Sequence, residues 1–289
     1  MEWHDIRNPA SPELDRLAER YGLHALHVED CRHGGQRAKV EDSSGYVFIV
    51  LKPIEFNAEC KLTSGDLDVF LGRDWIITVH EFECKEVCER LDRIRSGRER
   101  NPRADDLFYR IFDHLVDTYP PVLDRLNELI DGIEDEVLES PDPKMLQKIL
   151  SIKRTLIEFR RILGNMRDVA SHIQRMDTDL IGRDMWPFLR DVYDHLARHM
   201  DLVEMQRDLL TGAMDIYLSS VANRTNQVMK VLTVLGTIAL PSIVVSGFYG
   251  MNTKDLPFAG TAHGTWIAGG LILVTTAALL WILRRLNWL

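Results

Sequence analysis

Seven residues near the C-terminus recur along one face of an apolar stretch. They are Asn226, Met229, Leu232, Gly236, Leu240, Ile243 and Gly247, with spacings of 3, 3, 4, 4, 3 and 4. Residues three and four apart share a face of an α-helix, so the seven form one stripe. The stripe is polar at its first residue, apolar through its middle, and contains no ionisable group. Such a stripe can line an ion path, or it can face lipid or another helix.

The apolar stretch closes with Gly250, Met251 and Asn252. Glycine and asparagine are ordinary residues at the end of a helix. A helix C-terminus also carries free carbonyls and the negative end of the helix dipole, so a ring of such ends attracts cations without any carboxylate. This chemistry suits a strongly hydrated ion such as Mg2+, which gives up its water reluctantly. An asparagine carbonyl can contact the hydrated ion without holding it too long.

The stripe lies on a predicted transmembrane helix, residues 228–250, whose one charge is Lys230. At 1.5 Å per residue, the apolar stretch spans about 30 Å, the thickness of the hydrocarbon core of a bilayer. A second apolar run, residues 266–283, carries no charge. Two spans cannot enclose a channel, so any pore requires an oligomer.

Basic residues flank the spans on one side. Arg224 and Lys230 lie at the start of the first span and a basic tail, residues 284–289, follows the second, whereas the loop 251–265 has only Lys254. The positive-inside rule therefore places both termini in the cytoplasm and the loop outside. The polar N-terminus lacks the apolar region of a signal peptide. We expect a multi-pass protein of the inner (plasma) membrane with a periplasmic loop.

The residues before the spans predict an α/β domain. Pro12–Tyr21 fits a short helix. The β-branched and aromatic run Tyr46–Lys52 predicts a buried strand. Leu67–Leu71 and Trp75–His80 predict a hairpin, and Leu23–Glu29 fits either a strand or a second short helix.

A long helical pattern joins this domain to the first span. It contains no proline between Pro187 and Pro241, and it predicts one helix from Met185 to Gly250, about 100 Å long. A helix of this length needs neighbours, so we expect a parallel bundle of identical chains. The expected domains are a cytoplasmic α/β domain (1–119), a cytoplasmic helical hairpin (120–183), a stalk helix (184–227), a first transmembrane helix (228–250), a periplasmic loop (251–265), a second transmembrane helix (266–283) and a basic cytoplasmic tail (284–289).

Composition excludes several classes of function. The net charge of −9 argues against a nucleic-acid partner. Cys31, Cys60, Cys84 and Cys88 are not expected to form disulfides in a reduced compartment. His80 precedes Cys84 and Cys88 at a spacing that could suit a metal, but no second cluster completes four ligands. No pairing of nucleophile and base and no glycine-rich phosphate loop indicates an enzyme.

The sequence Tyr249-Gly250-Met251-Asn252, closing the first of two C-terminal spans, resembles the GMN signature of the CorA-type divalent cation transporters. Asp215–Thr233 resembles the stalk-to-membrane segment of that family, and Arg190–His195 resembles a stalk segment. Val28–Asp30 with Tyr46–Lys52 resembles its N-terminal domain. The resemblance covers nearly the whole chain. It implies a funnel-shaped homopentamer in the lipid bilayer, with the first span lining the pore.

The resemblance also implies roles for individual residues. Gly250, Met251 and Asn252 would form the outer selectivity filter, with Asn252 contacting the hydrated ion. The seven residues of the stripe would line the pore and its gate. Asp30 and Asp191 would bind regulatory Mg2+ between neighbouring subunits. The implied function is uptake of Mg2+, with Co2+ and Ni2+ as lesser ions, driven by the membrane potential and gated by intracellular Mg2+, without an organic cofactor.

Within the stripe, Met229 and Leu232 fall where the family has its hydrophobic gate. Two departures from the family pattern leave the identity of the transported ion undecided. Ile243 stands where a pore threonine is common, and the loop Thr253–Thr265 lacks the usual acidic and aromatic sequence after GMN. That loop looks closer to the zinc-transporting branch. The alternative is a Zn2+ transporter of the same architecture, including a proton-coupled one. A third hypothesis is a membrane-anchored structural or signalling oligomer, which the GMN match opposes.

Overall fold

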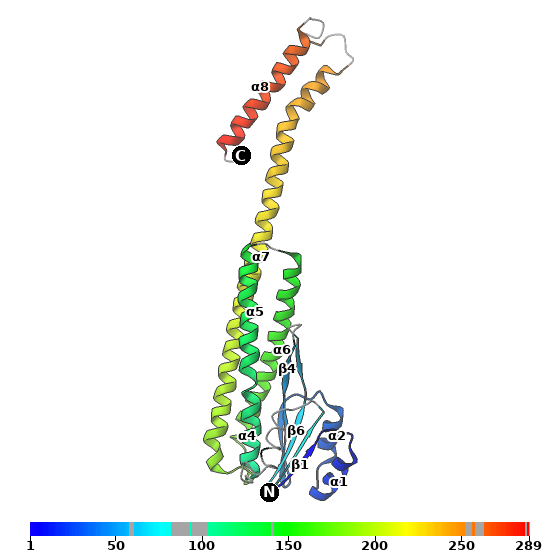
Figure 1. Ribbon diagram of the computed structural model, residues 1–289, viewed down its shortest axis with the longest axis vertical. Coiled ribbons are helices and arrows are strands. Elements are labelled where there is room, and N and C mark those ends of the chain that lie inside the picture. The colour runs from blue at the N-terminus through cyan, green and yellow to red at the C-terminus, as the bar shows by residue number, and fades with distance from the viewer. Residues whose placement is uncertain are drawn as a thin grey trace. The chain divides into compact units, whose positions relative to one another are not determined.

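The computed structural model describes residues 1–57, 61–81, 93, 103–139, 142–251, 256–257, 263–286 and 288. These form two compact units, Met1–Asp215 and Ile216–Leu289, which are described separately (Figure 1). Asn252, Cys60, Cys84 and Cys88 lie outside the described residues. The seven domain ranges expected from the sequence divide the chain by expected location and role, and they stay predictions.

A five-stranded sheet organises the first unit. Its strands are β1 (Glu2–Ile6), β2 (Lys39–Ser43), β3 (Tyr46–Leu51), β6 (Leu67–Gly72) and β7 (Trp75–His80), in the order β1-β7-β6-β3-β2. β1 runs parallel to β7, and the remaining neighbours are antiparallel. The predicted strand at residue 46 and the predicted hairpin after residue 67 are confirmed. β4 (Ile54–Phe56) and β5 (Leu62–Ser64) pair as a second, small sheet.

Two short helices cover one face of the large sheet. α1 (Pro12–Tyr21) begins at Ser11, whose hydroxyl accepts the N–H of Glu13 at 3.2 Å. α2 (Ala25–His33) shows that the helical alternative for the segment after residue 23 is the correct one. The core beneath them is apolar; it includes Leu14, Leu17, Val28, Cys31, Phe48, Val50, Phe70, Ile77 and Val79.

Longer helices cover the opposite face, so that the sheet lies between two helical layers (Figure 1). α4 (Ala104–Val116) packs on β6 and β7, and α6 (Pro143–Ile173) packs on β2 and β5. α5 (Tyr119–Glu139) starts with a buried tyrosine whose hydroxyl donates to the backbone carbonyl of Lys52 at 2.8 Å. This bond ties α5 to the chain that leaves β3.

A single helix then runs to the C-terminal part of the chain. After the turn η1 (Arg183–Met185), α7 extends from Trp186 to Tyr249 over 64 residues, with Pro241 inside it. The prediction of one uninterrupted helix is thus confirmed to within a residue at each end. In the first unit α7 buries one apolar face, which includes Leu189, Val192, Leu196, Val203 and Leu210.

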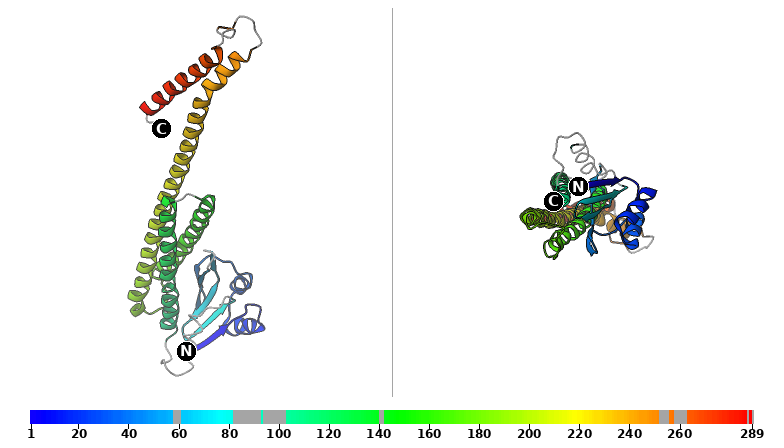
Figure 2. Two further views of the ribbon diagram at one scale, coloured as in Figure 1. Left: turned by 45° about the horizontal axis from the view of Figure 1, so that its top comes forward. Right: turned by 90° about the horizontal axis from the view of Figure 1, so that it is seen from below.

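The second unit consists of the C-terminal part of α7 and the helix α8 (Gly264–Arg285), which runs beside it in Figure 1 and in the left view of Figure 2. Both helices are long and apolar enough to cross a membrane, and each contains an 18-residue window with a mean hydropathy of 2.1. α8 ends with Arg284 and Arg285 in its last turn.

Candidate ion pathway and regulatory site

The predicted stripe forms an open face of α7. Met229, Leu232, Leu240 and Ile243 are 55%, 62%, 57% and 66% exposed, although all four are large and apolar. A Cβ added at Gly236 or Gly247 would have nothing within 4 Å. Asn226 is exposed as well. The structure therefore brings the seven residues together on one unpartnered face.

The buried side of the same helix lies roughly opposite. Val234, Pro241 and Val245 are buried, and their spacing of seven and four places them on one face. At 100° per residue this face is turned well away from the stripe. The stripe thus remains available for lipid or for further copies of the chain.

Hydroxyl groups in this part of α7 bond to the helix itself. Thr225, Thr233 and Ser246 donate to the carbonyls of Val221, Met229 and Ile243 at 2.9, 2.8 and 3.2 Å. On α8, Thr275 donates to the carbonyl of Leu271 at 2.7 Å. Polar groups inside a bilayer need internal partners, because no water is available there. These bonds fit helices surrounded by hydrocarbon.

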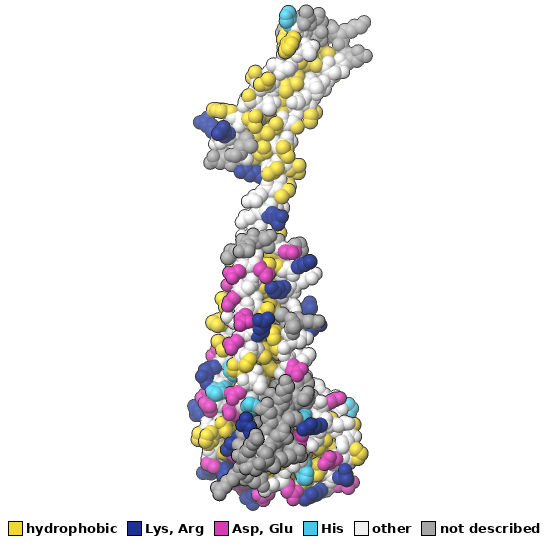
Figure 3. Space-filling model, viewed as in Figure 1, with side chains coloured by type: hydrophobic (Ala, Val, Ile, Leu, Met, Phe, Trp, Pro, Cys, Tyr) yellow, Lys and Arg dark blue, Asp and Glu magenta, His cyan; other side chains and the backbone are white. Residues whose placement is uncertain are grey.

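The surface of the second unit points to the same environment. Apolar side chains cover the part of α7 and α8 seen in Figure 3, with Lys and Arg confined to its edges. Leu273 and Val274 on α8 are 72% and 68% exposed. Exposed apolar surface of this extent marks a membrane or protein interface.

α7 ends at the predicted selectivity filter. The N–H of Gly250 donates to the carbonyl of Ser246 at 2.9 Å, and the N–H of Met251 donates to that of Phe248 at 3.3 Å. A Cβ at Gly250 would lie 2.9 Å from the Ser246 oxygen, so any larger residue would press on the last turn. Asn252, the third predicted filter residue, lies outside the described part of the chain.

Asp30, one predicted regulatory residue, lies on α2 and is already paired. Lys39 on β2 places its Nζ 2.7 Å from Oδ2 of Asp30 and 2.6 Å from Oε1 of Glu41. Glu41 in turn accepts from His27 at 3.0 Å, and Tyr46 bonds the other ring nitrogen of His27 at 2.7 Å. Asp30 is thus the outer end of a chain of polar contacts that reaches the buried core.

Asp191, the other predicted regulatory residue, lies near the start of α7 with its side chain 60% exposed. Its carboxylate is 3.6 Å from the imidazole of His195. Asp113 on α4 belongs to the same neighbourhood: burial raises the pKa of its carboxyl, and the charges of Asp117 and Asp191 raise it further. Burial, followed by the positive charges of His195 and Arg198, lowers the pKa of His199 to about 4.

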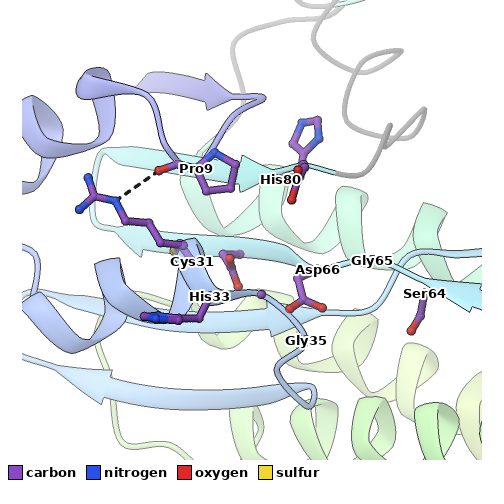
Figure 4. Close-up of a pocket in the computed structure, with 12 residues that line it drawn as sticks. Pro9, Cys31, His33, Gly35, Ser64, Gly65, Asp66 and His80 are labelled. Carbon is purple, nitrogen blue, oxygen red and sulfur yellow. Dashed lines mark hydrogen bonds between the residues drawn. The ribbon is translucent and has the colours of Figure 1, made fainter.

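A cavity of about 380 Å³ opens beside α2 and β6 (Figure 4). Asp68 lines it with only 2% of its surface exposed, and no described residue bonds its Oδ1. Burial, followed by the charge of Asp66, raises the pKa of Asp68 to about 7. The neighbouring Cys31 is a buried free thiol whose pKa burial also raises. Asp66 is held by Lys52 and by the N–H of Gln36.

Metal ligation within one chain is not evident in the described ranges. Among those residues no group of three or more His, Cys, Asp or Glu side chains is placed to hold a metal ion. The predicted regulatory site requires Asp30 and Asp191 from two different subunits, so a single chain does not test it. Three residues that contact or surround Asp30 and Asp191 were not predicted from the sequence: Lys39, Glu41 and Asp113. For Lys39 and Glu41 the sequence holds an indication, because residues two apart on a strand point to the same side.

Together, the sheet domain, the long helix α7 with its apolar C-terminal part and the apolar helix α8 define a membrane protein with a large leading domain. The family model of the CorA-like Mg2+ transporter protein matches residues 1–285, and the chain belongs to this family. Its members are transporters and not enzymes. The chain is 39% identical over 248 residues to the cobalt/magnesium transport protein CorA of Thermotoga maritima, covering 84% of this chain and 70% of that protein.

Solved structures show the same fold. The complete structure of the CorA magnesium transporter from Methanocaldococcus jannaschii matches with a TM-score of 0.87 at 27% identity, over 99% of this chain and 91% of that one. The cytoplasmic domain of ZntB from Vibrio parahaemolyticus matches with a TM-score of 0.64 over 78% of this chain and 88% of that one. Its identity of 13% shows the fold alone.

Proposed function

We propose that this chain forms a homopentameric channel for Mg2+, with Co2+ and Ni2+ as lesser ions, in the cytoplasmic (inner) membrane. Both termini lie in the cytoplasm, and α7 of each copy lines the pore. The observation that carries this proposal is the open stripe of α7. Its face is free of charge, turned away from the buried side of the helix, and closed by the GMN sequence.

The membrane potential supplies the driving force. Moving one charge across 100 mV is worth about 2.3 kcal/mol, so a divalent ion gains about 4.6 kcal/mol. Hydrated Mg2+ meets Gly250, Met251 and Asn252 at the outer mouth. Met229 and Leu232 close the pore at its inner end, because a narrow apolar constriction excludes water and ions.

Intracellular Mg2+ closes the channel by feedback. At high concentration the ion bridges Asp30 of one subunit and Asp191 of the next, and this contact stabilises the closed state. When Mg2+ leaves, the carboxylates repel and the subunit interface loosens. The mechanism is a population shift, because the ion binds the two states with different affinity.

Flux measurements in proteoliposomes test the proposal. We expect Mg2+ uptake to depend on an inside-negative potential and to fall steeply in Asn252→Ala. Asp191→Asn should weaken inhibition by internal Mg2+ without abolishing uptake. Intact flux of all divalent ions in Asn252→Ala would refute the selectivity filter.

The second candidate is a Zn2+ transporter of the same architecture, including a proton-coupled one. It is favoured by the loop Thr253–Thr265, which lacks the usual acidic sequence after GMN, and by Ile243 in place of a pore threonine. Parallel uptake of Mg2+ and Zn2+ into the same vesicles, with and without a pH gradient, decides between the two candidates.

A further inference from the structure

Lys39 occupies the position of a cation beside Asp30. Its Nζ lies 2.7 Å from Oδ2 of Asp30 on α2 and 2.6 Å from Oε1 of Glu41 on its own strand. The Lys39 and Asp30 side chains are only 20% and 26% exposed. Because the pair is partly shielded from water, its electrostatic interaction is stronger than that of a surface ion pair.

The positive charge of Lys39 is secured by its surroundings. Burial acts to lower the pKa of Lys39, but the hydrogen bonds and charges of Asp30 and Glu41 outweigh it and raise that pKa. The Lys39 ammonium also lies 5.5 Å from the centre of the Phe48 ring, an arrangement in which the ring face attracts a cation. Glu41 is fixed by His27 on its other oxygen. The ammonium is therefore a permanent charge in a defined place.

We propose that Lys39 is a built-in competitor of the regulatory cation at Asp30. This inference rests on the proposed role of Asp30 in Mg2+ feedback. A divalent ion that approaches Asp30 meets a carboxylate already neutralised by an ammonium, and it must displace or outweigh that charge. Lys39 thereby raises the Mg2+ concentration needed to close the channel.

Glu41 governs the strength of this competition. It shares the ammonium with Asp30, and so it draws part of the charge of Lys39 away from the ion site. The two residues consequently have opposite effects. Loss of the Lys39 charge makes Asp30 a better cation ligand. Loss of the Glu41 charge leaves Asp30 as the only carboxylate paired with Lys39, and so makes Asp30 a poorer cation ligand.

The test is the inhibition of channel current by internal Mg2+, with the full-length protein in liposomes. We expect Lys39→Met to lower the half-inhibiting Mg2+ concentration about tenfold, as expected for one fixed charge acting on a divalent ion in a partly screened site. Glu41→Gln should raise that concentration. Lys39→Arg keeps the charge and should stay within about twofold of the unaltered protein, because both side chains remain protonated.

The direction of the change in the half-inhibiting Mg2+ concentration separates competition by Lys39 from a purely structural role. A Lys39→Met protein that merely lost its local fold would need more Mg2+ for inhibition, not less, and that result would overturn the inference. So would equal shifts in Lys39→Met and Lys39→Arg. In an Asp30→Asn background, Lys39→Met should produce no further shift, since the competing pair is already absent. A full tenfold shift there would also overturn the inference.

Failure of the proposed function gives a different result. If Asp30→Asn and Asp191→Asn both leave Mg2+ inhibition unchanged, the feedback site itself is refuted. If these two variants weaken inhibition but Lys39→Met does not strengthen it, the feedback site stands and only the competition by Lys39 is refuted.

Discussion

The side-chain amide of Gln206 on α7 donates a hydrogen bond of 2.8 Å to the backbone carbonyl of Leu123 on α5. Gln206 is 3% exposed, and its own carbonyl oxygen has no partner among the described residues. A buried polar side chain with one bond made and one oxygen unpaired is sensitive to substitution. It joins the long helix to the neighbouring helix of the first unit.

The first prediction concerns this contact. Gln206→Ala should lower the free energy of unfolding by about 1–3 kcal/mol, because it removes the bond and leaves a cavity. Gln206→Met should cost less than Gln206→Ala, since its side chain fills the space that alanine leaves empty. Thermal unfolding of the detergent-solubilised protein measures both. An equal loss in the two variants would show that the cavity contributes nothing and that the whole loss comes from the missing hydrogen bond.

The second prediction is a pH dependence of stability caused by Asp68. Its pKa is about 7 in the folded protein, against about 3.9 for an exposed aspartate. The protonated carboxyl therefore contributes stability that is complete below pH about 4 and is lost as the pH rises to about 7. Above pH 7 the loss is constant. Asp68→Asn stays neutral, so it should become more stable than the unaltered protein by a few kcal/mol across this range.

Unfolding midpoints at several pH values between 4 and 8 test this prediction. Asp42→Asn is the matched control, because Asp42 is an exposed aspartate on β2. A pH-independent difference for Asp68→Asn would mean that Asp68 is ionised throughout the range.

The third prediction concerns the end of α7. Gly250→Ala places a Cβ 2.9 Å from the Ser246 carbonyl oxygen, so the last turn must shift. We expect Mg2+ uptake to fall about tenfold, which requires only about 1.4 kcal/mol of added barrier. Gly269→Ala on α8 is the control, because a Cβ there meets nothing within 4 Å. Equal uptake by the two variants would argue against a strict geometry at the filter.

The fourth prediction tests the apolar gate. Leu232→Asn should hydrate the constriction and leave a current at internal Mg2+ levels that close the unaltered channel, because apolar gates act by excluding water. Leu235→Asn provides a matched control: Leu232 and Leu235 are 62% and 61% exposed, but Leu235 lies off the stripe. Single-channel recordings should show the leak in the first variant and not in the second. A leak in both would refute the assignment of the stripe to the pore.

The strands and helices with a regular pattern of apolar residues were predictable from the sequence. β3 and the hairpin of β6 and β7 are runs of β-branched and aromatic residues, and α7 follows an unbroken helical pattern. β1 was not predicted, because only Ile6 in it is buried and its parallel partner lies more than seventy residues away in the chain. Long-range parallel pairing leaves no local pattern in a sequence.

The candidate site was predictable only in part. The stripe on α7 follows from helical spacing alone, and the structure leaves its larger members exposed. The contact of Lys39 with Asp30 was not predictable, because it depends on how β2 packs beside the helix α2 that precedes it. The raised pKa of Asp113 was not predictable, because its main cause is burial, and burial follows from the packing between helices.

The strand order also has a consequence for how the chain is made. β1 pairs only with β7 among the described strands, so it has no place in the sheet until residue 80 has left the ribosome. The strands β2, β3, β6 and β7 pair with neighbours that are closer in sequence, and they can assemble first. At about 5–20 residues per second, translation from residue 80 to residue 228 takes on the order of 10 s. The sheet can thus be complete before the first membrane segment is synthesised.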